Sequence, residues 1–235
     1  ALGSLNDWTP AVSSQPVISK WNTTGDQRSY LLQVIAAGLL SFRSSSDGIN
    51  STVIANSSVA PGFTDGSTHW VRVTLDADTA GSRTVTFYTS DDNINWTQLG
   101  AAVTGAATSI HSGTSTLNVG AHSTGTGDPF AGKIYRAQVY DGINGTLVAD
   151  FNASFIAAGG TSYVDSTGKT WTVNTSGSPA ASIVSEPDSM VSGKQVGLAA
   201  TIGTSDTDYG TFVDRGSFDM AKNEKRVQRL STYKG

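Results

Sequence analysis

The sequence has 235 residues, of which 26 are glycine, 14% are charged and none is cysteine. This length suits one large domain, and the high glycine content with few charges disfavours helical bundles and coiled coils. The absence of cysteine excludes disulfides and thiolate metal sites, so packed sheets must supply the stability.

The formal net charge of −4 is unevenly distributed along the chain. Residues 1–213 contain 9 Lys and Arg against 16 Asp and Glu, whereas residues 214–235 contain 6 against 3. An acidic body with a basic end is a poor nucleic-acid binder, so no nucleic-acid partner is expected.

Membrane insertion is not expected either, because no run approaches the ~20 apolar residues of a membrane span. Residues 1–7 do not resemble a signal peptide, although removal of an upstream signal is compatible with the sequence.

The first third of the chain predicts short strands separated by turns. Residues 16–21 form the first. Residues 29–37 are almost continuously apolar, and residues 39–43 follow directly across Gly38. A helix is conceivable there, but strands buried on both faces are also apolar throughout, so we favour two central strands. After the turn signal Asp47-Gly48 comes another strand at residues 49–54.

The clearest pattern is a hairpin between residues 65–76 and 84–89, joined by a turn at residues 78–82. The first strand alternates strictly: one side carries Val71, Val73 and Leu75, and the other carries Trp70, Arg72, Thr74 and Asp76. The first side is therefore expected to face the core. Further strands are expected at residues 96–100, 116–121, 135–140 and 147–152, with a final pair around Tyr163 and Trp171. Strands about every ten residues favour a two-sheet antiparallel sandwich over a parallel α/β fold.

Several segments together resemble the concanavalin A-like, laminin-G-type jelly roll, in particular the modules found in tail and other virion proteins of phages that infect actinobacteria. The segments are 7–10 (Asp-Trp-Thr-Pro), 19–30, 65–73, 85–92, 128–139 and 168–172. The resemblance covers about residues 5–185 and implies an all-β jelly-roll sandwich. Such modules usually have a strand or two before the Asp-Trp-Thr-Pro segment, but only residues 1–6 precede it here and they are not expected to supply that strand. Either the chain was cut, or another segment provides the missing strand. Residues 194–202 alternate in hydrophobicity, and we expect them to fill that place at an edge of the sandwich.

The predicted organisation is therefore a sandwich at residues 1–185 and a C-terminal extension at residues 186–235. Within the extension, residues 203–213 read as a polar linker and residues 214–235 as a basic docking tail. Ser217 could cap a short helix in that tail.

The resemblance implies a non-enzymatic virion protein, either a minor tail protein or a surface-exposed adhesion module that binds glycan or the host surface. A capsid decoration or cement protein without ligand is an alternative, and so is a carbohydrate-binding module from a secreted glycoside hydrolase, which would make the protein extracellular. The expected partners are other virion proteins, contacted through residues 186–235, and a cell-surface glycan. We expect a homo-oligomer or a part of a larger assembly.

No catalytic pair of carboxylates is apparent. Jelly-roll glucanases place theirs on one strand, whereas Glu186 and Glu224 are the only glutamates here and both lie outside the sandwich. The run at residues 90–96 loosely echoes the aspartate box of sialidases, but reads better as a hairpin turn with Asp91 and Asp92 in it. No enzyme activity and no cofactor are expected.

Candidate binding residues lie in the loops. His122, Asp128, Asp26 and Arg28 are candidate ligand-binding residues. Asp26, Asp47 and Asp128 are candidate calcium ligands, because laminin-G-type modules often bind calcium through loop carboxylates. The three histidines are dispersed, which disfavours a transition-metal site. Five tryptophans could stack on sugars, although packing in the core or on the sheet surface is their default role.

Overall fold

A computed structural model describes residues 1–11, 13–176 and 180–184. Strands, turns and loops make up this part almost entirely, together with two short 3-10 segments, η1 (Ala36–Gly38) and η2 (Ala153–Phe155). The strands in chain order are β1 (Leu2–Leu5), β2 (Gln15–Asn22), β3 (Gln27–Val34), β4 (Leu40–Ser44), β5 (Val53–Asn56), β6 (Thr68–Thr79), β7 (Ser82–Ser90), β8 (Thr97–Gln98), β9 (Val103–Ala106), β10 (Asn118–Val119), β11 (Gly132–Asp141), β12 (Thr146–Asn152), β13 (Ser162–Val164) and β14 (Thr170–Thr172).

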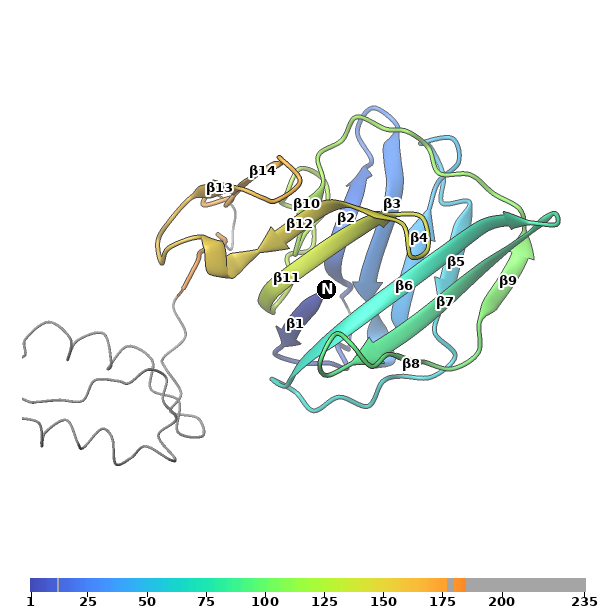
Figure 1. Cartoon of the computed structure of the whole chain (residues 1–235), viewed down its shortest axis with the longest axis horizontal. Coiled ribbons are helices and arrows are strands. Elements are labelled where there is room, and N and C mark those ends of the chain that lie inside the picture. Colours follow the sequence, from blue (N-terminus) through green and yellow to red (C-terminus); the bar gives the residue numbers. More distant parts are fainter. Residues whose placement is uncertain (12, 177–179, 185–235) are drawn as a thin grey trace, which may run out of the picture. The chain divides into compact units, whose positions relative to one another are not determined.

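Two antiparallel sheets pack as a sandwich, and the short pair β13–β14 lies beside β12 (Figure 1). The larger sheet has the strand order β12-β11-β1-β6-β7-β8, with β9 also pairing with β7, and the smaller has the order β10-β2-β3-β4-β5. The prediction of an all-β, jelly-roll-like sandwich is confirmed. Two central strands of the smaller sheet are present as predicted, since residues 29–34 lie in β3 and the neighbouring run lies in β4, but β3 ends at Val34 and Ala36–Gly38 forms η1 instead.

The core lies between the facing sides of the two sheets. Val34, Leu40 and Val53 from the smaller sheet and Val85 and Phe87 from the larger sheet have no exposed surface. Successive side chains of a strand point to opposite faces, so every second residue of these strands faces the core. Burying a side chain of this size contributes about 1.5–3 kcal/mol, so this cluster is the main stabilising element of the sandwich.

The predicted hairpin forms from β6 and β7, with Arg72 opposite Tyr88 and Val73 opposite Phe87. Its turn is Ala80-Gly81, and both residues have positive φ, 54° and 84°. Two positive-φ residues in a two-residue loop give the turn type whose twist matches that of the strands. Val71 is buried, and Val73 and Leu75 are partly buried against the core, as expected for the inner side, whereas Trp70 on the opposite side is buried as well.

The chain begins with a strand that the sequence did not suggest. Strand β1 lies in the middle of the larger sheet, between β11 and β6. Its Leu5 is fully buried, and the backbone N–H of Val71 donates to the carbonyl of Ala1 at 2.8 Å. The expectation that residues 1–6 provide no strand was therefore wrong. The expectation failed because β1 is short: four residues are too few to show the alternation of buried and exposed side chains that marks a strand.

Other strands differ from expectation in extent. Strand β5 begins at Val53 rather than at residue 49, because residues 45–50 form a closed loop. Strand β9 was not anticipated. Strands β13 and β14 pair Tyr163 with Trp171, as the sequence indicated, but they form a separate two-stranded sheet.

A long connection from β9 to β10 crosses one end of the sandwich (Figure 1). Its His111 N–H donates to the carbonyl of Ser45 at 2.7 Å, and the Lys20 ammonium donates to the carbonyl of Ser115 at 2.6 Å. These bonds tie the connection to the smaller sheet. Burial lowers the pKa of Lys20, as expected for an ammonium held away from water.

The C-terminal predictions fall outside the described residues. They are the boundary at residue 185, the strand at 194–202, the linker at 203–213, and the helix and basic tail at 214–235. Within the described ranges, no helix is long and apolar enough to cross a membrane.

Candidate functional site

Asp47 is used by its own loop. Its Oδ1 accepts hydrogen bonds from the backbone N–H groups of Ile49 and Asn50, at 2.8 and 2.9 Å, and from the Ser45 hydroxyl at 2.9 Å. These donors hold the pKa of Asp47 well below its usual range, with the backbone N–H of Asn50 contributing most. The carboxylate thus closes the β4–β5 loop, which is the turn-forming role of aspartate.

The same loop occurs a second time, at the end of β7. Asp92 accepts from the N–H groups of Ile94 and Asn95, each at 2.8 Å, and from the Ser90 hydroxyl at 3.0 Å. The backbone N–H of Asn95 contributes most to the lowered pKa of Asp92. Residues 45–50 and 90–95 share Ser, Asp, Ile and Asn at the first, third, fifth and sixth positions. The repeat of these four residues is visible in the sequence, but it was not predicted that the two runs form the same loop.

Arg28 and Asp26 lie beside the first of these loops. The Arg28 guanidinium donates hydrogen bonds to the carbonyls of Gly48 and Ile49, so its N–H groups are used by the backbone of this loop. Asp26 occupies the β2–β3 turn with a φ of +56°. The fold therefore brings Arg28 to the Asp47 loop, but as a contact that holds the loop in place.

His122 and Asp128 meet across a tight loop. His122 Nε2 lies 3.2 Å from an oxygen of Asp128, and His122 Nδ1 lies 2.8 Å from the Ser123 hydroxyl. The carbonyl of His122 also accepts three backbone N–H groups of the loop. Of the predicted ligand residues, these two form the only direct side-chain pair in the described part of the chain. The Asp128 side chain stays 56% exposed.

The predicted calcium ligands are not brought into one group. Among the described residues, no three His, Asp or Glu side chains are placed to hold a metal ion together. Calcium needs six to eight oxygen ligands, and Asp47 Oδ1 already accepts three hydrogen bonds from its own loop. Calcium binding by Asp26, Asp47 and Asp128 thus stays a prediction.

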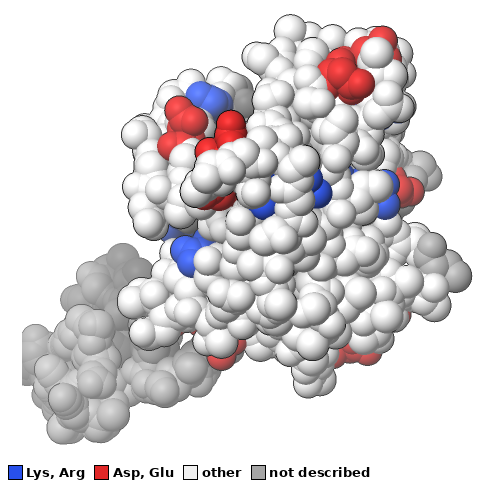
Figure 2. All heavy atoms as spheres, turned by 90° about the vertical axis from the view of Figure 1, so that its right-hand side faces the viewer, with Lys and Arg blue, Asp and Glu red and all other residues white. Residues whose placement is uncertain are grey.

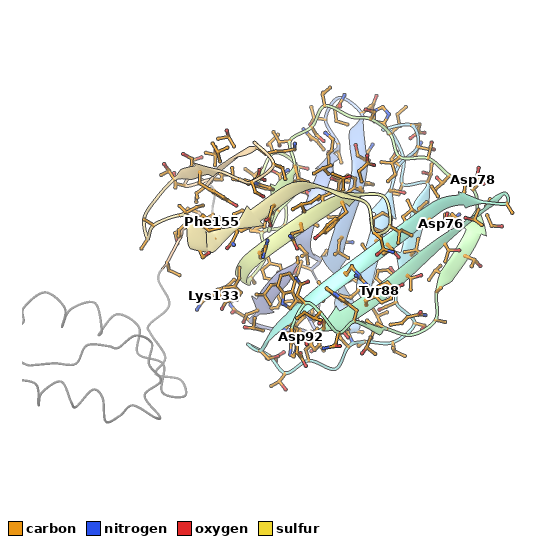
Figure 3. The ribbon with its side chains drawn as sticks, in the orientation of Figure 1. Asp76, Asp78, Tyr88, Asp92, Lys133 and Phe155 are labelled. Carbon is orange, nitrogen blue, oxygen red and sulfur yellow. The ribbon has the colours of Figure 1, made fainter. Side chains whose placement is uncertain are left out.

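A cluster that the sequence analysis did not select lies on the outer face of the larger sheet. The guanidinium carbon of Arg72 is 4.4 Å from the centre of the Tyr88 ring and 4.3 Å from that of Trp96. Trp70 meets Trp96 edge to face, with ring centres 6.5 Å apart. We call Arg72, Tyr88 and Trp96 the outer-face cluster. Figure 3 marks Tyr88 over the β6–β7 hairpin, with Asp92 near the end of β7.

The sheet and the Asp92 loop build this cluster. Arg72 and Tyr88 are directly opposed in the β6–β7 register, so their side chains share one face. Trp96 comes back over that face because the loop closed by Asp92 turns the chain between β7 and β8. The signal for the cluster was the alternation in β6, which placed Trp70 and Arg72 together on the outer side.

Arg72 differs from the paired Arg136. Arg136 binds both oxygens of Asp150, at 2.9 and 2.8 Å, and this pair raises its pKa. By contrast, Nε of Arg72 is buried and has no hydrogen-bond partner within the described chain. Arg72, Tyr88 and Trp96 are all half-buried, so part of each remains open to solvent. Such a group offers aromatic surface and N–H donors at one place.

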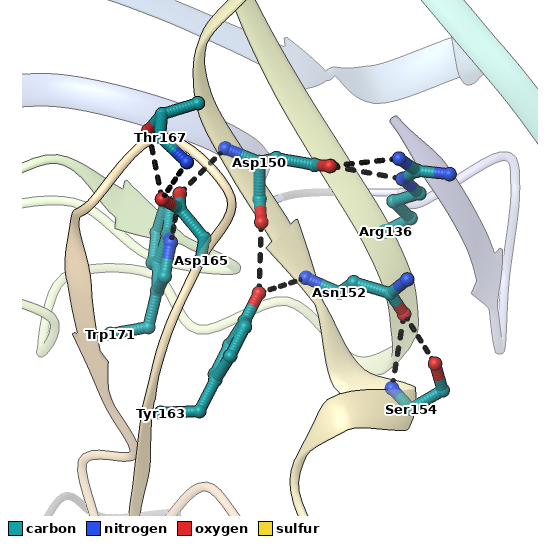
Figure 4. Close-up of polar contacts among 8 residues, drawn as sticks. All are labelled: Arg136, Asp150, Asn152, Ser154, Tyr163, Asp165, Thr167 and Trp171. Carbon is teal, nitrogen blue, oxygen red and sulfur yellow. Dashed lines mark hydrogen bonds and ion pairs between the residues drawn. The ribbon is translucent and has the colours of Figure 1, made fainter.

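A buried polar network holds β13–β14 against β12 (Figure 4). The Asp165 carboxylate accepts from the N–H of Asp150, from the indole N–H of Trp171 and from backbone and hydroxyl donors at Thr167 and Lys169. Burial alone would raise the pKa of Asp165, but these donors outweigh it and lower the pKa. The Tyr163 hydroxyl donates to the Asp150 carbonyl at 2.8 Å. Trp171 is thereby fixed as a structural residue.

No protein-family model matches the chain, and neither a curated protein nor a solved structure matches it.

Proposed function

We propose that the sandwich is a glycan-binding module displayed on the surface of a bacteriophage particle, with the outer-face cluster as its binding surface. The observation that carries the glycan part is the stacking of Arg72 against Tyr88 and Trp96 on a sheet face. The phage setting rests on the resemblance of the sequence segments alone.

The chemistry of the cluster suits a sugar. Sugar rings bind through aromatic surface that covers their C–H groups and through donors that meet their hydroxyls or carboxylates. The cluster offers both, since Tyr88 and Trp96 supply ring surface and Arg72 supplies N–H groups in a planar fork. Figure 2 views the molecule turned by 90° from Figure 1, and charged side chains are scattered there among uncharged ones.

Binding to purified cell-wall glycans of actinobacteria tests the proposal. We expect saturable binding by the wild-type chain, and about tenfold weaker binding for Trp96→Ala, the loss typical of a central aromatic contact. Arg72→Lys keeps the charge but loses the planar fork, so it is expected to weaken binding several-fold. Arg83→Lys on β7 is the matched control, because the Arg83 guanidinium donates to the carbonyl of Ala106, outside the cluster. That variant is expected to bind like wild type.

Equal binding by wild type and a folded Trp96→Ala variant would refute the assignment of the surface. The absence of binding to any glycan of a broad bacterial array would refute the glycan function and favour the decoration-protein alternative. The setting has its own test, which is labelling of purified phage particles with an antibody against residues 1–185. Particles that carry no label would rule out a virion location.

A further inference from the structure

A serine, a histidine and an aspartate form a hydrogen-bonded chain at one end of the larger sheet. The Ser67 hydroxyl oxygen lies 2.9 Å from His69 Nε2, and His69 Nδ1 lies 2.7 Å from Asp91 Oδ1. In the Ser-His-Asp arrangement of acyl-transfer enzymes, the serine also meets Nε2 and the carboxylate also meets Nδ1. Such groups are recognised by geometry and role rather than by the order of residues.

The strand geometry places the three groups together. Ser67 directly precedes β6 and His69 is the second residue of that strand, and their side chains meet at 2.9 Å. Trp70 pairs with Ser90 in the β6–β7 register, and extending that register by one residue sets Asp91 opposite His69. The orienting carboxylate thus comes from the neighbouring strand end.

Neighbouring aromatic residues fix the imidazole. Phe63 stacks on the His69 ring with centres 3.8 Å apart and planes 5° apart. The Trp8 ring meets the same imidazole edge to face at 6.4 Å, and its indole N–H donates to the Ser67 carbonyl at 3.1 Å. Ser67 is half-buried and the Asp91 side chain is 86% exposed, so a small reagent reaches the group from solvent.

We infer that Ser67 is a nucleophile for acyl transfer, with His69 as its general base and Asp91 as a positioning residue for the imidazole. The Ser67 oxygen attacks the acyl carbon of an ester, its proton passes to His69 Nε2, and the bond from the acyl carbon to the alcohol oxygen breaks. His69 returns the proton to the departing alcohol. A water molecule then hydrolyses the acyl-serine, giving a carboxylic acid and free Ser67. The inference is independent of glycan binding by the outer-face cluster.

The surroundings limit the substrates to activated esters. The N–H of Gly66 already donates to the Leu5 carbonyl at 2.8 Å, and the N–H of Ser67 to the Thr64 carbonyl at 2.9 Å. Neither is free to stabilise an oxyanion, and one missing donor costs about 10²–10³-fold in rate. The Ser67 hydroxyl also donates to the Thr64 carbonyl and must turn from it to His69. The reaction is therefore expected to be slow, and to favour small acyl groups on good leaving groups.

The chain contains its own comparator. Ser123, His122 and Asp128 are also hydrogen-bonded to one another, but with the ring nitrogens exchanged, since Ser123 meets Nδ1 and Asp128 meets Nε2 at the longer distance of 3.2 Å. Ser123 is also in a left-handed conformation, with a φ of +49°. The two groups share residue types and differ in arrangement, so a reagent that responds to arrangement should distinguish them.

The test is labelling of the full chain with a fluorophosphonate, in which the serine oxygen attacks phosphorus and fluoride leaves. Intact mass gives the rate, and peptide mapping gives the site. We expect Ser67 to be labelled at least about tenfold faster than Ser123, and the Ser67 label to be absent from Ser67→Ala. His69→Gln should slow labelling of Ser67 at least about tenfold. Ser123→Ala should leave labelling of Ser67 unchanged.

Hydrolysis of p-nitrophenyl acetate separates the positioning role of Asp91 from a structural one. Asp91→Asn is expected to lower kcat about tenfold with little change in KM, because an exposed carboxylate orients the ring less firmly than a buried one. Asp91→Glu should recover part of kcat. Labelling of Ser67 in folded wild type no faster than of Ser123 overturns the inference, and this comparison needs no variant. Unchanged labelling in a folded His69→Gln variant also overturns it.

Discussion

The indole N–H of Trp171 donates to the Asp165 carboxylate across 2.9 Å, and this bond joins β14 to the loop that follows β13. Because Asp165 also accepts from the backbone of Asp150 in β12, one carboxylate links three strands. Asp165 is therefore a main attachment point of the β13–β14 pair, beside the Tyr163 hydroxyl that donates to the Asp150 carbonyl.

Asp165→Ala is expected to destabilise the fold by about 2–3 kcal/mol, because several buried donors lose their acceptor at once. The measurement is urea unfolding followed by tryptophan fluorescence, to which Trp171 in the affected segment contributes as one of five tryptophans. Asp141→Ala is the control, as Asp141 lies in the exposed β11–β12 hairpin end. An Asp165→Ala variant as stable as that control would contradict the assigned role.

The same carboxylate predicts a pH dependence. The pKa of Asp165 is lowered in the folded protein from its ordinary value of 3.8, so folding favours the ionised form. Its contribution to stability is complete above about pH 4–5 and is lost as the pH falls through the lower folded pKa. The difference in unfolding free energy between wild type and Asp165→Asn should therefore narrow as the pH decreases from about 5 to 2. Asp47 and Asp92 titrate in both proteins, so their effects cancel. A difference that stays constant over this range would refute the role of the ionised form.

The two repeated loops are expected to differ in how much stability a substitution costs at equivalent positions. Gly48 and Asn93 occupy the same place in their loops, and both have positive φ, 82° and 64°. Asn93→Gly should change stability by less than about 1 kcal/mol, because glycine accepts this conformation. Gly48→Asn should cost about 2 kcal/mol or more, since its Cβ would overlap the carbonyl of Asp26 and lie 2.8 Å from the His111 ring. Thermal unfolding of the two variants side by side gives the comparison, and equal losses would contradict it.

The stacking of Arg72 contributes to stability as well as to the proposed binding. Arg72→Met should lower the free energy of unfolding by about 1–2 kcal/mol, because two cation–π contacts are lost. Arg72→Lys retains the charge near the rings and should lose less than about 1 kcal/mol. Urea unfolding of both variants checks this, and it also shows whether a loss of glycan binding reflects the surface or the fold. An Arg72→Met variant as stable as wild type would contradict the packing role.

The alternation of apolar residues was sufficient to predict the sandwich, because a half-buried strand displays its period over six or more residues. It was insufficient for β1, where Leu2–Leu5 spans four residues and owes its place to partners far along the chain. The loop aspartates show a different limit. A sequence reveals that Asp47 and Asp92 are present, but only the fold reveals that N–H donors already occupy their oxygens.

The side-chain groupings were least accessible from the sequence. The spacing of Ser67 and His69 is visible, yet the approach of Asp91 depends on the register of the β6–β7 hairpin. The outer-face cluster similarly needs the Asp92 loop to bring Trp96 back over Arg72. Predicting either would require the register of a hairpin rather than its existence alone.

The central place of β1 has a consequence for synthesis on the ribosome. Strand β1 precedes both of its partners, β6 and β11, along the chain, and β11 is made only after residue 131. Until then, the larger sheet lacks one side, and β1 has an open edge with a ladder of unpaired backbone groups. Chains that terminate before β11 should therefore aggregate, and folding of the complete chain should be slow because its central pairing spans a long stretch of sequence.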